Sequence, residues 1–246
     1  MQQIGTIEII RRYPVKSMKG GNLDAVFVSY GGLIGDRVYA FVDETNTSKF
    51  PWMTARQKSE LLLFKPRFLH APDVAKEYPD IDDYALEVET PEGKIFNITN
   101  PEFQQHLEQR FIKPLRLRFS EKGMWDSRPV SLFGMNTLQQ LEKEMNIDLD
   151  HKRFRANFYA QWDNGIPFFE DELIGKTIQI GEKLKLMITG KDPRCVIITL
   201  DPNTGEKNFD ILKHVANRHE NSTGVYCVII REGIVKKGDA IFLFKE

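Results

Sequence analysis

Two cysteines, Cys195 and Cys227, are the strongest nucleophiles and the softest metal ligands in the sequence. Cys195 closes the polar segment Lys191-Asp-Pro-Arg-Cys195, in which cationic neighbours would lower the pKa of a thiol. A thiolate at this position would act as a nucleophile or would bind a soft metal, whereas a free cysteine is more often a small buried hydrophobe. The residue pattern alone favours burial, most strongly for Cys227 within the apolar stretch 225–230.

Basic side chains recur beside the expected turns of the chain. If the fold gathers them, they would hold a phosphate or another polyanion through charge-assisted hydrogen bonds. Taken singly, each is more often a solvated charge or the partner of a surface salt bridge. The residues concerned are Lys16, Lys19, Arg37, Arg56, Arg128, Arg153, Arg155 and Arg194.

Other common catalytic motifs are missing from the sequence. It contains no GxxxxGK[ST] phosphate loop, no GxSxG nucleophile elbow and no recognisable Ser-His-Asp order. His214 and His219 are five residues apart, which places them on different faces of a helix, so we expect no zinc pair. The two cysteines form neither a CxxC motif nor a disulfide framework.

The 246 residues suffice for one large core or two modest domains. The formal net charge of -1 provides no general attraction to nucleic acid or to an anionic membrane. No apolar stretch approaches the roughly 18 residues of a transmembrane helix, and the N-terminus lacks the pattern of a signal peptide. We therefore expect a cytoplasmic protein with reduced thiols that binds neither nucleic acid nor a membrane.

Short strands separated by Gly and Pro turns dominate the expected secondary structure. They are expected at 4–10, 23–30, 37–42, 115–119, 177–180, 184–189, 195–200, 225–231 and 240–244. The prolines and acidic residues of the stretch 71–83 predict a surface loop. No βαβ rhythm supports a Rossmann sheet, so the pattern predicts a mainly β fold with helices (α+β) and a barrel-like sheet.

Three helices are expected to interrupt these strands. One begins after Asn100, with Phe103, Leu107 and Phe111 on its buried face. A second begins at a capping box formed by Thr137 and Gln140, with Leu138, Leu141 and Met145 as its apolar stripe. The third covers 209–216, with Phe209, Leu212 and Val215 directed inward.

Seven sequence blocks in order resemble the MOSC-domain family. The resemblance implies a MOSC-type β-barrel with a smaller N-terminal β-rich domain, divided into a MOSC N-terminal β-barrel-like domain at 1–120 and a MOSC domain at 121–246. Within the family, the chain is similar to the mitochondrial amidoxime-reducing component and the bacterial YcbX-type proteins. The blocks are Tyr13-Pro-Val-Lys-Ser17, Gly35-Asp36-Arg37, Thr54-Ala-Arg-Gln57, Arg153-Phe-Arg-Ala-Asn157, Glu172-Leu-Ile-Gly175, the stretch from Arg194 to Gly205, and Val235-Lys-Lys-Gly-Asp239.

The resemblance implies a molybdenum cofactor, Mo-molybdopterin, held by one protein thiolate. Cys195 matches that metal ligand and has a catalytic role through it. Asp126 is the second catalytic candidate: it either helps a proton to arrive, with a pKa raised by desolvation, or accepts a hydrogen bond beside the cofactor. The cofactor-binding residues that the resemblance implies are Lys16, Ser17, Arg37, Ser127, Arg128, Arg155, Asn157, Arg194 and Cys195.

Several positions depart from the family pattern. Ala156 stands where the family has proline between an arginine and an asparagine. Pro193 replaces a frequent serine and removes one hydroxyl and one backbone N–H from the site. Phe133-Gly134-Met135 replaces a more polar stretch, so substrate contacts are expected to differ. YcbX-type proteins also carry an iron–sulfur domain, and we expect no iron–sulfur cluster here because the chain has only two cysteines.

The implied activity is that of a molybdenum-dependent oxidoreductase. Its substrates would be N-hydroxylated compounds, namely amidoximes, hydroxylamines or N-hydroxylated bases, and a separate flavoprotein or small redox carrier would donate the electrons. The alternative is a cofactor carrier or sulfur-transfer module, because a MOSC domain also forms part of the molybdenum cofactor sulfurases. Their pyridoxal phosphate binding belongs to another domain and is expected here only as a family-level association. A third alternative is an anion-binding β-barrel in which Cys195 is inert.

Overall fold

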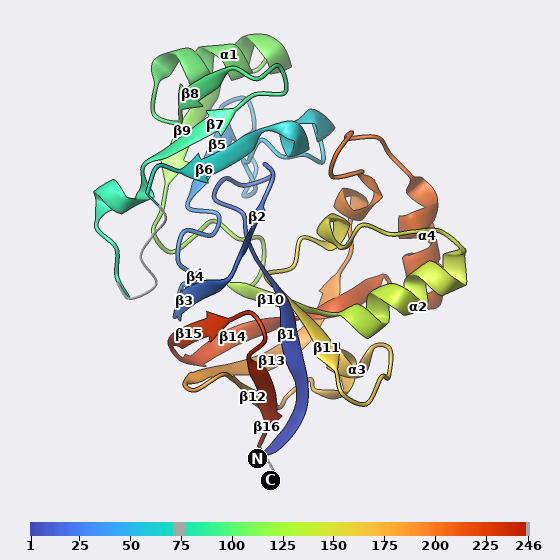
Figure 1. Ribbon diagram of the computed structural model, residues 1–246. Coiled ribbons are helices and arrows are strands. Elements are labelled where there is room, and N and C mark those ends of the chain that lie inside the picture. Colours follow the sequence, from blue (N-terminus) through green and yellow to red (C-terminus); the bar gives the residue numbers. More distant parts are fainter. Residues whose placement is uncertain (71–76, 245–246) are drawn as a thin grey trace.

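The computed structural model describes residues 1–70 and 77–244, in which seven strands close into a barrel (Figure 1). Their order is β11-β10-β14-β13-β12-β16-β1, and β1 closes the ring by pairing with β11. Only β10 and β11 pair in parallel in this ring. The bounds are β1 Gln2–Arg12, β10 Val130–Gly134, β11 Phe158–Trp162, β12 Thr177–Ile180, β13 Leu184–Pro193, β14 Ser222–Arg231 and β16 Ala240–Leu243.

The barrel interior is filled by the apolar residues that alternate along these strands. Ile7, Leu132 and Ile188 are fully buried there. Cys227 lies among them on β14, and burial raises the pKa of its thiol to about 12. The prediction that Cys227 is a core residue is therefore confirmed, as is the mainly β, barrel-type fold.

A second core lies in the smaller β-rich region drawn above the barrel in Figure 1. Here β5 pairs with β9, and β6, β7 and β8 form a separate sheet. The expected helix after Asn100 is confirmed as α1, with Phe103, Leu107 and Phe111 buried. The bounds are β5 Tyr39–Asp43, η1 Ser59–Leu63, β6 Lys65–Phe68, η2 Ile81–Tyr84, β7 Leu86–Glu89, β8 Ile95–Asn97, α1 Pro101–Phe111 and β9 Leu115–Phe119.

Short strands from the N-terminal part of the chain pair with the barrel and with a strand from its C-terminal part. β2 extends the barrel sheet beside β1, and β15 pairs with β3, which in turn pairs with β4. The barrel thus takes β1 from the N-terminal part of the sequence, and the domain division at residue 120 stays a prediction. The bounds are β2 Gly21–Leu23, β3 Ala25–Ser29, β4 Gly32–Leu33 and β15 Gly233–Lys236.

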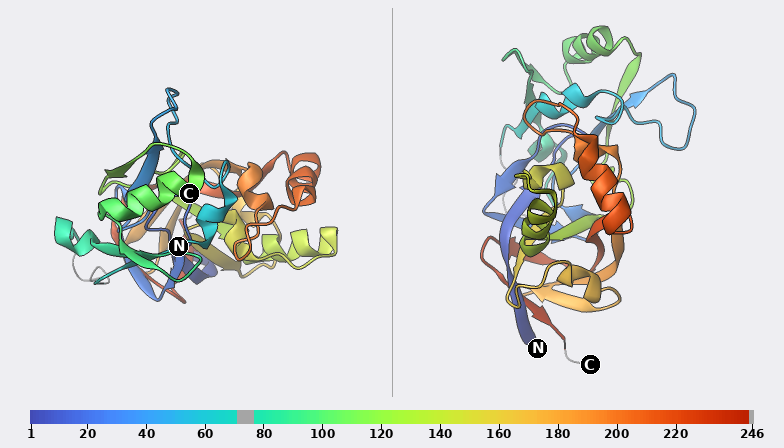
Figure 2. Two further views of the ribbon diagram at one scale, coloured as in Figure 1. Left: turned by 90° about the horizontal axis from the view of Figure 1, so that it is seen from above. Right: turned by 90° about the vertical axis from the view of Figure 1, so that its right-hand side faces the viewer.

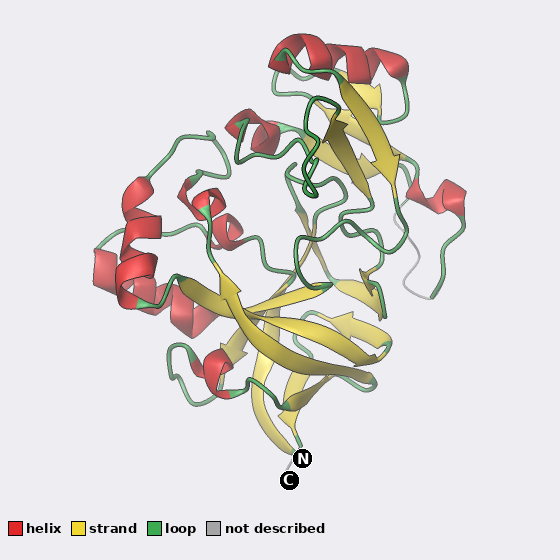
Figure 3. Ribbon diagram, turned by 180° about the vertical axis from the view of Figure 1, so that it is seen from behind, coloured by secondary structure: helices red, strands yellow, loops and turns green. Residues whose placement is uncertain are grey.

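Helices cover one side of the barrel, where α2 and α4 lie near each other (Figures 1 and 3). A third apolar cluster, which includes Leu141, Ile198 and Val215, fills the space beneath them. The described ranges contain no helix with both the length and the apolar character needed to cross a membrane. The bounds are α2 Met135–Met145, η3 His151–Phe154, α3 Phe169–Glu172, η4 Val196–Thr199 and α4 Phe209–Arg218.

Three local expectations are wrong. The stretch 195–200 is not a strand, because the chain turns into η4 after Cys195. Thr137 does not cap α2: it is the third residue of the helix, and its hydroxyl donates instead to Glu170. Phe209 begins α4 with 59% of its surface exposed, and Ile211 takes the buried position. The predicted loop 71–83 falls partly outside the described residues, and Ile81–Tyr84 is a 3-10 turn.

Glu170 on α3 is a buried carboxylate that ties this helix to the barrel. Its oxygens accept hydrogen bonds from Gly134 N at 3.0 Å, Thr137 Oγ1 at 2.9 Å and Trp162 Nε1 at 2.9 Å. Glu170→Ala would leave these donors without a partner in a dry site, so we expect a loss of about 3 kcal/mol in the free energy of unfolding. Urea denaturation measures it, with the exposed Glu172→Ala on the same helix as control. Equal stabilities of the two variants would contradict the prediction.

Candidate functional site

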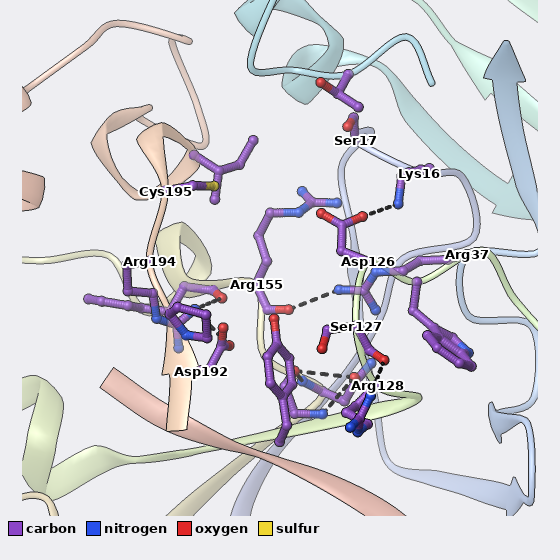
Figure 4. Close-up of a pocket in the computed structure, with 18 of the residues that line it drawn as sticks. Lys16, Ser17, Arg37, Asp126, Ser127, Arg128, Arg155, Asp192, Arg194 and Cys195 are labelled. Carbon is purple, nitrogen blue, oxygen red and sulfur yellow. Dashed lines mark hydrogen bonds and ion pairs between the residues drawn. The ribbon is translucent and has the colours of Figure 1, made fainter. Parts of the chain in front are cut away.

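One cavity is lined by every site residue that the family resemblance implies (Figure 4). Of the basic residues considered for anion binding, Lys19 and Arg153 do not line it. It lies where the loops after β1, between β9 and β10, around η3 and after β13 converge. The roles of these residues stay predictions, but their side chains are brought together from positions more than 170 residues apart. The lining residues are Lys16, Ser17, Arg37, Thr54, Arg56, Trp125, Asp126, Ser127, Arg128, Ser131, Phe154, Arg155, Asn157, Asp192, Pro193, Arg194, Cys195, Ile197 and Tyr226.

Three of the expected residues adopt the left-handed backbone conformation that side chains other than glycine rarely accept. The φ angles are 67° for Ser17, 53° for Arg37 and 53° for Arg155. Each such residue costs about 1 kcal/mol or more and persists only where surrounding contacts enforce it. Their occurrence around one cavity indicates that the backbone is held in place to present these side chains.

Arg37 is fixed by the Gly35-Asp36-Arg37 turn. The Asp36 carboxylate accepts from the backbone N of Tyr13 at 2.7 Å and forms an ion pair with the Arg37 guanidinium. Burial opposes the charge of Arg37, but the attraction of Asp36 outweighs it and the pKa of Arg37 is raised. A second nitrogen of Arg37 donates to the carbonyl of Arg155 at 3.1 Å, which joins two distant parts of the site.

Arg155 is a cation without a carboxylate partner within the described ranges. Its guanidinium donates to the carbonyl of Met18 at 3.0 Å and lies over the Tyr13 ring, 4.3 Å from the centroid. Desolvation lowers the pKa of Arg155 to about 10, and it remains positively charged at neutral pH. In the view of Figure 4 it lies between Cys195 and Lys16. The cavity therefore contains a desolvated positive charge that an anionic ligand would neutralise.

Lys16 and Arg56 share the carboxylate of Asp126, one on each oxygen. The Lys16 ammonium also donates to the carbonyl of Met124 at 2.7 Å, and its pKa is lowered by burial. Burial alone would raise the pKa of Asp126, but these cations and Arg37 lower it. The expected raised pKa of Asp126 is therefore wrong, because the carboxylate lies among cations rather than in an apolar pocket. The other role considered for Asp126, that of a hydrogen-bond acceptor, agrees with this geometry.

Arg194 and Asn157 line the cavity, but their polar groups are hydrogen-bonded to other parts of the protein. The Arg194 guanidinium donates to the carbonyls of Thr223 and Phe154, at 2.8 and 3.0 Å, and forms an ion pair with Asp192 at 3.0 Å. The Asn157 oxygen accepts from the backbone N of Ser131 at 3.3 Å. Both side chains thus position the surrounding strands and turns more than they offer free donors.

Ser127 and Arg128 lie at the rim of the cavity. Arg128 is exposed, and its guanidinium donates to the carbonyl of Ser127 at 3.1 Å. No carboxylate among the described residues pairs with it within 4.0 Å. Arg128 is therefore free to turn toward a ligand that enters from solvent.

Cys195 lies on the opposite wall of the cavity from Lys16 and Ser17 in Figure 4, and the residue is half-buried. It follows Arg194 and precedes η4, so the chain bends there and leaves the thiol at the surface of the cavity. The first expectation from residue pattern alone, a buried structural Cys195, is wrong. The thiol is accessible to a ligand bound among the cations.

Asp192 and Tyr226 are site residues that the sequence reasoning missed. Asp192 is buried on β13 and pairs with Arg194, but burial outweighs this attraction and raises the pKa of its carboxyl. Tyr226 on the neighbouring β14 hydrogen-bonds to Asp192, and burial also raises the pKa of Tyr226. The only signal for Asp192 was its place three residues before Cys195, and none pointed to Tyr226.

Comparisons with known proteins identify two domain families along this chain. Residues 4–118 match the MOSC N-terminal beta barrel domain, and residues 116–242 match the MOSC domain. The mitochondrial amidoxime reducing component 2 of Bos taurus is 22% identical over 98% of this chain and 84% of its own length. Among solved structures, the YuaD protein of Bacillus subtilis superposes with a TM-score of 0.48 at 14% identity, over 97% of this chain and 94% of its own. YiiM of Geobacillus stearothermophilus superposes over 48% of this chain and 55% of its own, with a TM-score of 0.38 at 14% identity. Because the two domain matches together span the chain from residue 4 to residue 242, this protein belongs to the MOSC-domain family.

Proposed function

We propose that the protein binds the molybdenum cofactor in this cavity and uses it to reduce N-hydroxylated compounds. The observation that carries the proposal is the meeting of an accessible thiol, Cys195, with a desolvated cation, Arg155, in one cavity. MOSC domains are associated with binding of the molybdenum cofactor. The reaction is suggested by the name of the amidoxime reducing component, which is similar to this chain over most of its length.

The donor set of the cavity fits such a group. A pterin phosphate is a dianion and requires fixed cations, which Lys16, Arg37 and Arg155 supply from three different loops. The soft metal requires a thiolate, and Cys195 is the accessible one of the two cysteines. When bound, the cofactor supplies the two-electron redox chemistry that side chains lack.

The chain's own residues would bind the anionic part of the cofactor and orient it in the cavity. Arg155 and Arg37 hold an anionic ligand by charge and by their planar donor geometry. The Tyr13 ring packs against both guanidinium groups, with its centroid 4.3 Å from Cζ of Arg155 and 4.8 Å from Cζ of Arg37. Asp126 keeps Lys16 and Arg56 in position through its ion pairs. Ion pairs and hydrogen bonds within the protein hold these side chains in one arrangement, which favours electrostatic stabilisation of a bound anion.

Proton delivery is assigned to Asp192 rather than to Asp126. Reduction of an N–O bond to an amine or amidine and water consumes protons, and a donor must be protonated at working pH. The lowered pKa of Asp126 keeps that carboxylate ionised, whereas burial raises the pKa of Asp192 despite its ion pair with Arg194, so Asp192 is the more readily protonated of the two. The Tyr226 hydroxyl lies beside Asp192 and hydrogen-bonds to its carboxyl group. The charges that shift the pKa of Asp192 are those of Arg194, Arg37 and Asp126.

The direct test is metal content paired with turnover. Protein produced in a host that makes the cofactor is expected to contain about one molybdenum per chain by mass spectrometry of the digested sample. It is also expected to reduce benzamidoxime to benzamidine with an artificial electron donor. Absence of molybdenum would refute cofactor binding, and molybdenum without turnover would favour the cofactor carrier or sulfur-transfer alternative. A separate flavoprotein or small redox carrier is the proposed physiological donor.

The pH dependence of turnover separates the two carboxylates. A donor with a raised pKa is protonated at low pH and loses its proton as pH rises through that pKa, so kcat should fall toward alkaline pH. Asp192→Asn is expected to lower kcat and to remove this fall. Asp126→Asn is the matched control and should keep the shape of the profile between about pH 5 and pH 8, because Asp126 is already ionised there. A profile that loses its slope only in Asp126→Asn would reverse the assignment.

A further inference from the structure

Glu144, His214 and His219 form a cluster away from the cavity. One carboxylate oxygen of Glu144, Oε2, lies 2.7 Å from Nε2 of His214 and 2.7 Å from Nε2 of His219. The three potential ligand atoms all lie within 4.8 Å of one another. The cluster joins α2, which carries Glu144, to the end of α4, and these two helices lie side by side in the right-hand view of Figure 2.

The expectation that His214 and His219 point in different directions is wrong. It assumed that one helix carries both residues, but α4 ends at Arg218. His219 is the C-cap, with φ -131° and ψ 34°, and this departure from helical geometry brings its ring back beside His214. The two ring centroids are 5.7 Å apart.

The donor atoms are those that zinc prefers. Two imidazole nitrogens and one carboxylate oxygen form a common three-ligand set, completed by water as the fourth ligand. With bonds of about 2.0–2.1 Å, tetrahedral ligand atoms lie about 3.3 Å apart. Small side-chain rotations would therefore open the two 2.7 Å contacts to the required spacing. The ion would replace the protons that now hold each nitrogen against the shared oxygen.

Neighbouring groups hold these side chains in position. Gln140 donates from Nε2 to the other oxygen of Glu144 at 2.8 Å, which orients the carboxylate. The ring of Phe168 stacks on His219 with centroids 4.4 Å apart. The side chains of Glu144, His214 and His219 are 24%, 20% and 15% exposed, so an ion and one water can enter from solvent. Fixed outer partners of this kind strengthen metal sites.

We propose that Glu144, His214 and His219 bind one zinc ion that ties α2 to α4. Both helices pack on the apolar cluster that contains Ile198 of η4, and η4 begins directly after Cys195. The ion would therefore brace the layer behind the thiol without touching the cavity. This site is independent of the proposed molybdenum function.

The test is zinc titration of the metal-free, full-length protein carrying Cys195→Ser, which removes the accessible thiol as a competing ligand. Isothermal titration calorimetry should give one zinc per chain, and thermal unfolding should move to higher temperature. Co²⁺ in place of zinc should show the intense visible absorption of a tetrahedral site. His214→Gln and Glu144→Gln should each weaken zinc binding by about a hundredfold or more, and Gln140→Ala by about tenfold. His70→Gln, an exposed histidine outside the cluster, is the control and should bind as tightly as its parent.

Two outcomes would overturn the proposal. Absence of a one-to-one zinc complex would leave the cluster as two histidines hydrogen-bonded to one carboxylate. Equal zinc affinity of His214→Gln and His70→Gln would place the ion elsewhere. Neither result depends on molybdenum content or on turnover, so failure here is distinguishable from failure of the proposed reductase function.

Discussion

Cys195→Ser is expected to abolish benzamidoxime reduction and to remove most of the bound molybdenum, while the fold stays intact. Cys195 is half-buried and lines the cavity, so replacement of its thiol by a hydroxyl is sterically mild, but it removes the one soft ligand among the lining residues. Turnover should fall at least about a thousandfold, because the loss of the thiolate ligand weakens metal binding and also changes the redox properties of any metal that remains. Steady-state kinetics and metal analysis measure the two effects.

The matched control for this variant is Cys227→Ala. It removes the other thiol, which is buried in the barrel core. It should retain molybdenum and turnover, with only a small loss of stability from the missing sulfur. Normal activity in Cys195→Ser, or equal loss in both variants, would refute the assignment of Cys195 as the ligand.

Arg155→Gln is expected to weaken retention of the cofactor by about ten- to a hundredfold. The substitution keeps a polar, hydrogen-bonding side chain, although a shorter one, and removes the desolvated charge that has no carboxylate partner in the described part of the chain. A charge-assisted hydrogen bond of about 1.5–3 kcal/mol corresponds to that range in affinity. Molybdenum occupancy after dialysis measures the effect, and added inorganic phosphate should raise the thermal midpoint of the unloaded parent more than that of the variant.

Arg128→Gln and Arg37→Gln complete this series. Arg128 is exposed at the rim, so its replacement should cost little occupancy. Arg37 is held by Asp36, and its replacement should weaken retention in the same direction as Arg155→Gln, although the unpaired Asp36 carboxylate would add a penalty of its own. Unchanged occupancy in both Arg155→Gln and Arg37→Gln would mean that the anion binds elsewhere.

The sequence predicts this fold well where apolar alternation or helix caps are strong. β1, α1 and β9 lie close to their expected bounds because their buried faces follow simple periods. β10 and β11 were missed, since nearly all their residues are buried and no alternation marks them. The stretch after Cys195 reads as a strand by composition, yet its backbone forms η4 because it must turn away from the barrel.

The site was predictable only in part and for a definable reason. Cys195, Lys16, Arg37 and Arg155 belong to ordered sequence blocks, so resemblance identified them, and the structure brings them to one cavity. Tyr226 belongs to no such block and reaches the cavity because β14 pairs with β13. Pairings between distant strands are not encoded in local spacing. The pKa values of Asp126 and Asp192 depend on those same long-range neighbours, which explains why the expectation for Asp126 failed.

The closed order of the barrel has a consequence for biosynthesis. β14 lies between β10 and β13, and β16 lies between β12 and β1, so the ring cannot close until β16 has left the ribosome. Arg37 and Arg155 meet only when segments more than a hundred residues apart are joined, which makes the cavity a late product of folding. The early cations alone therefore do not form the cavity, and we expect loading to follow the synthesis of the segments that carry Arg155 and Cys195.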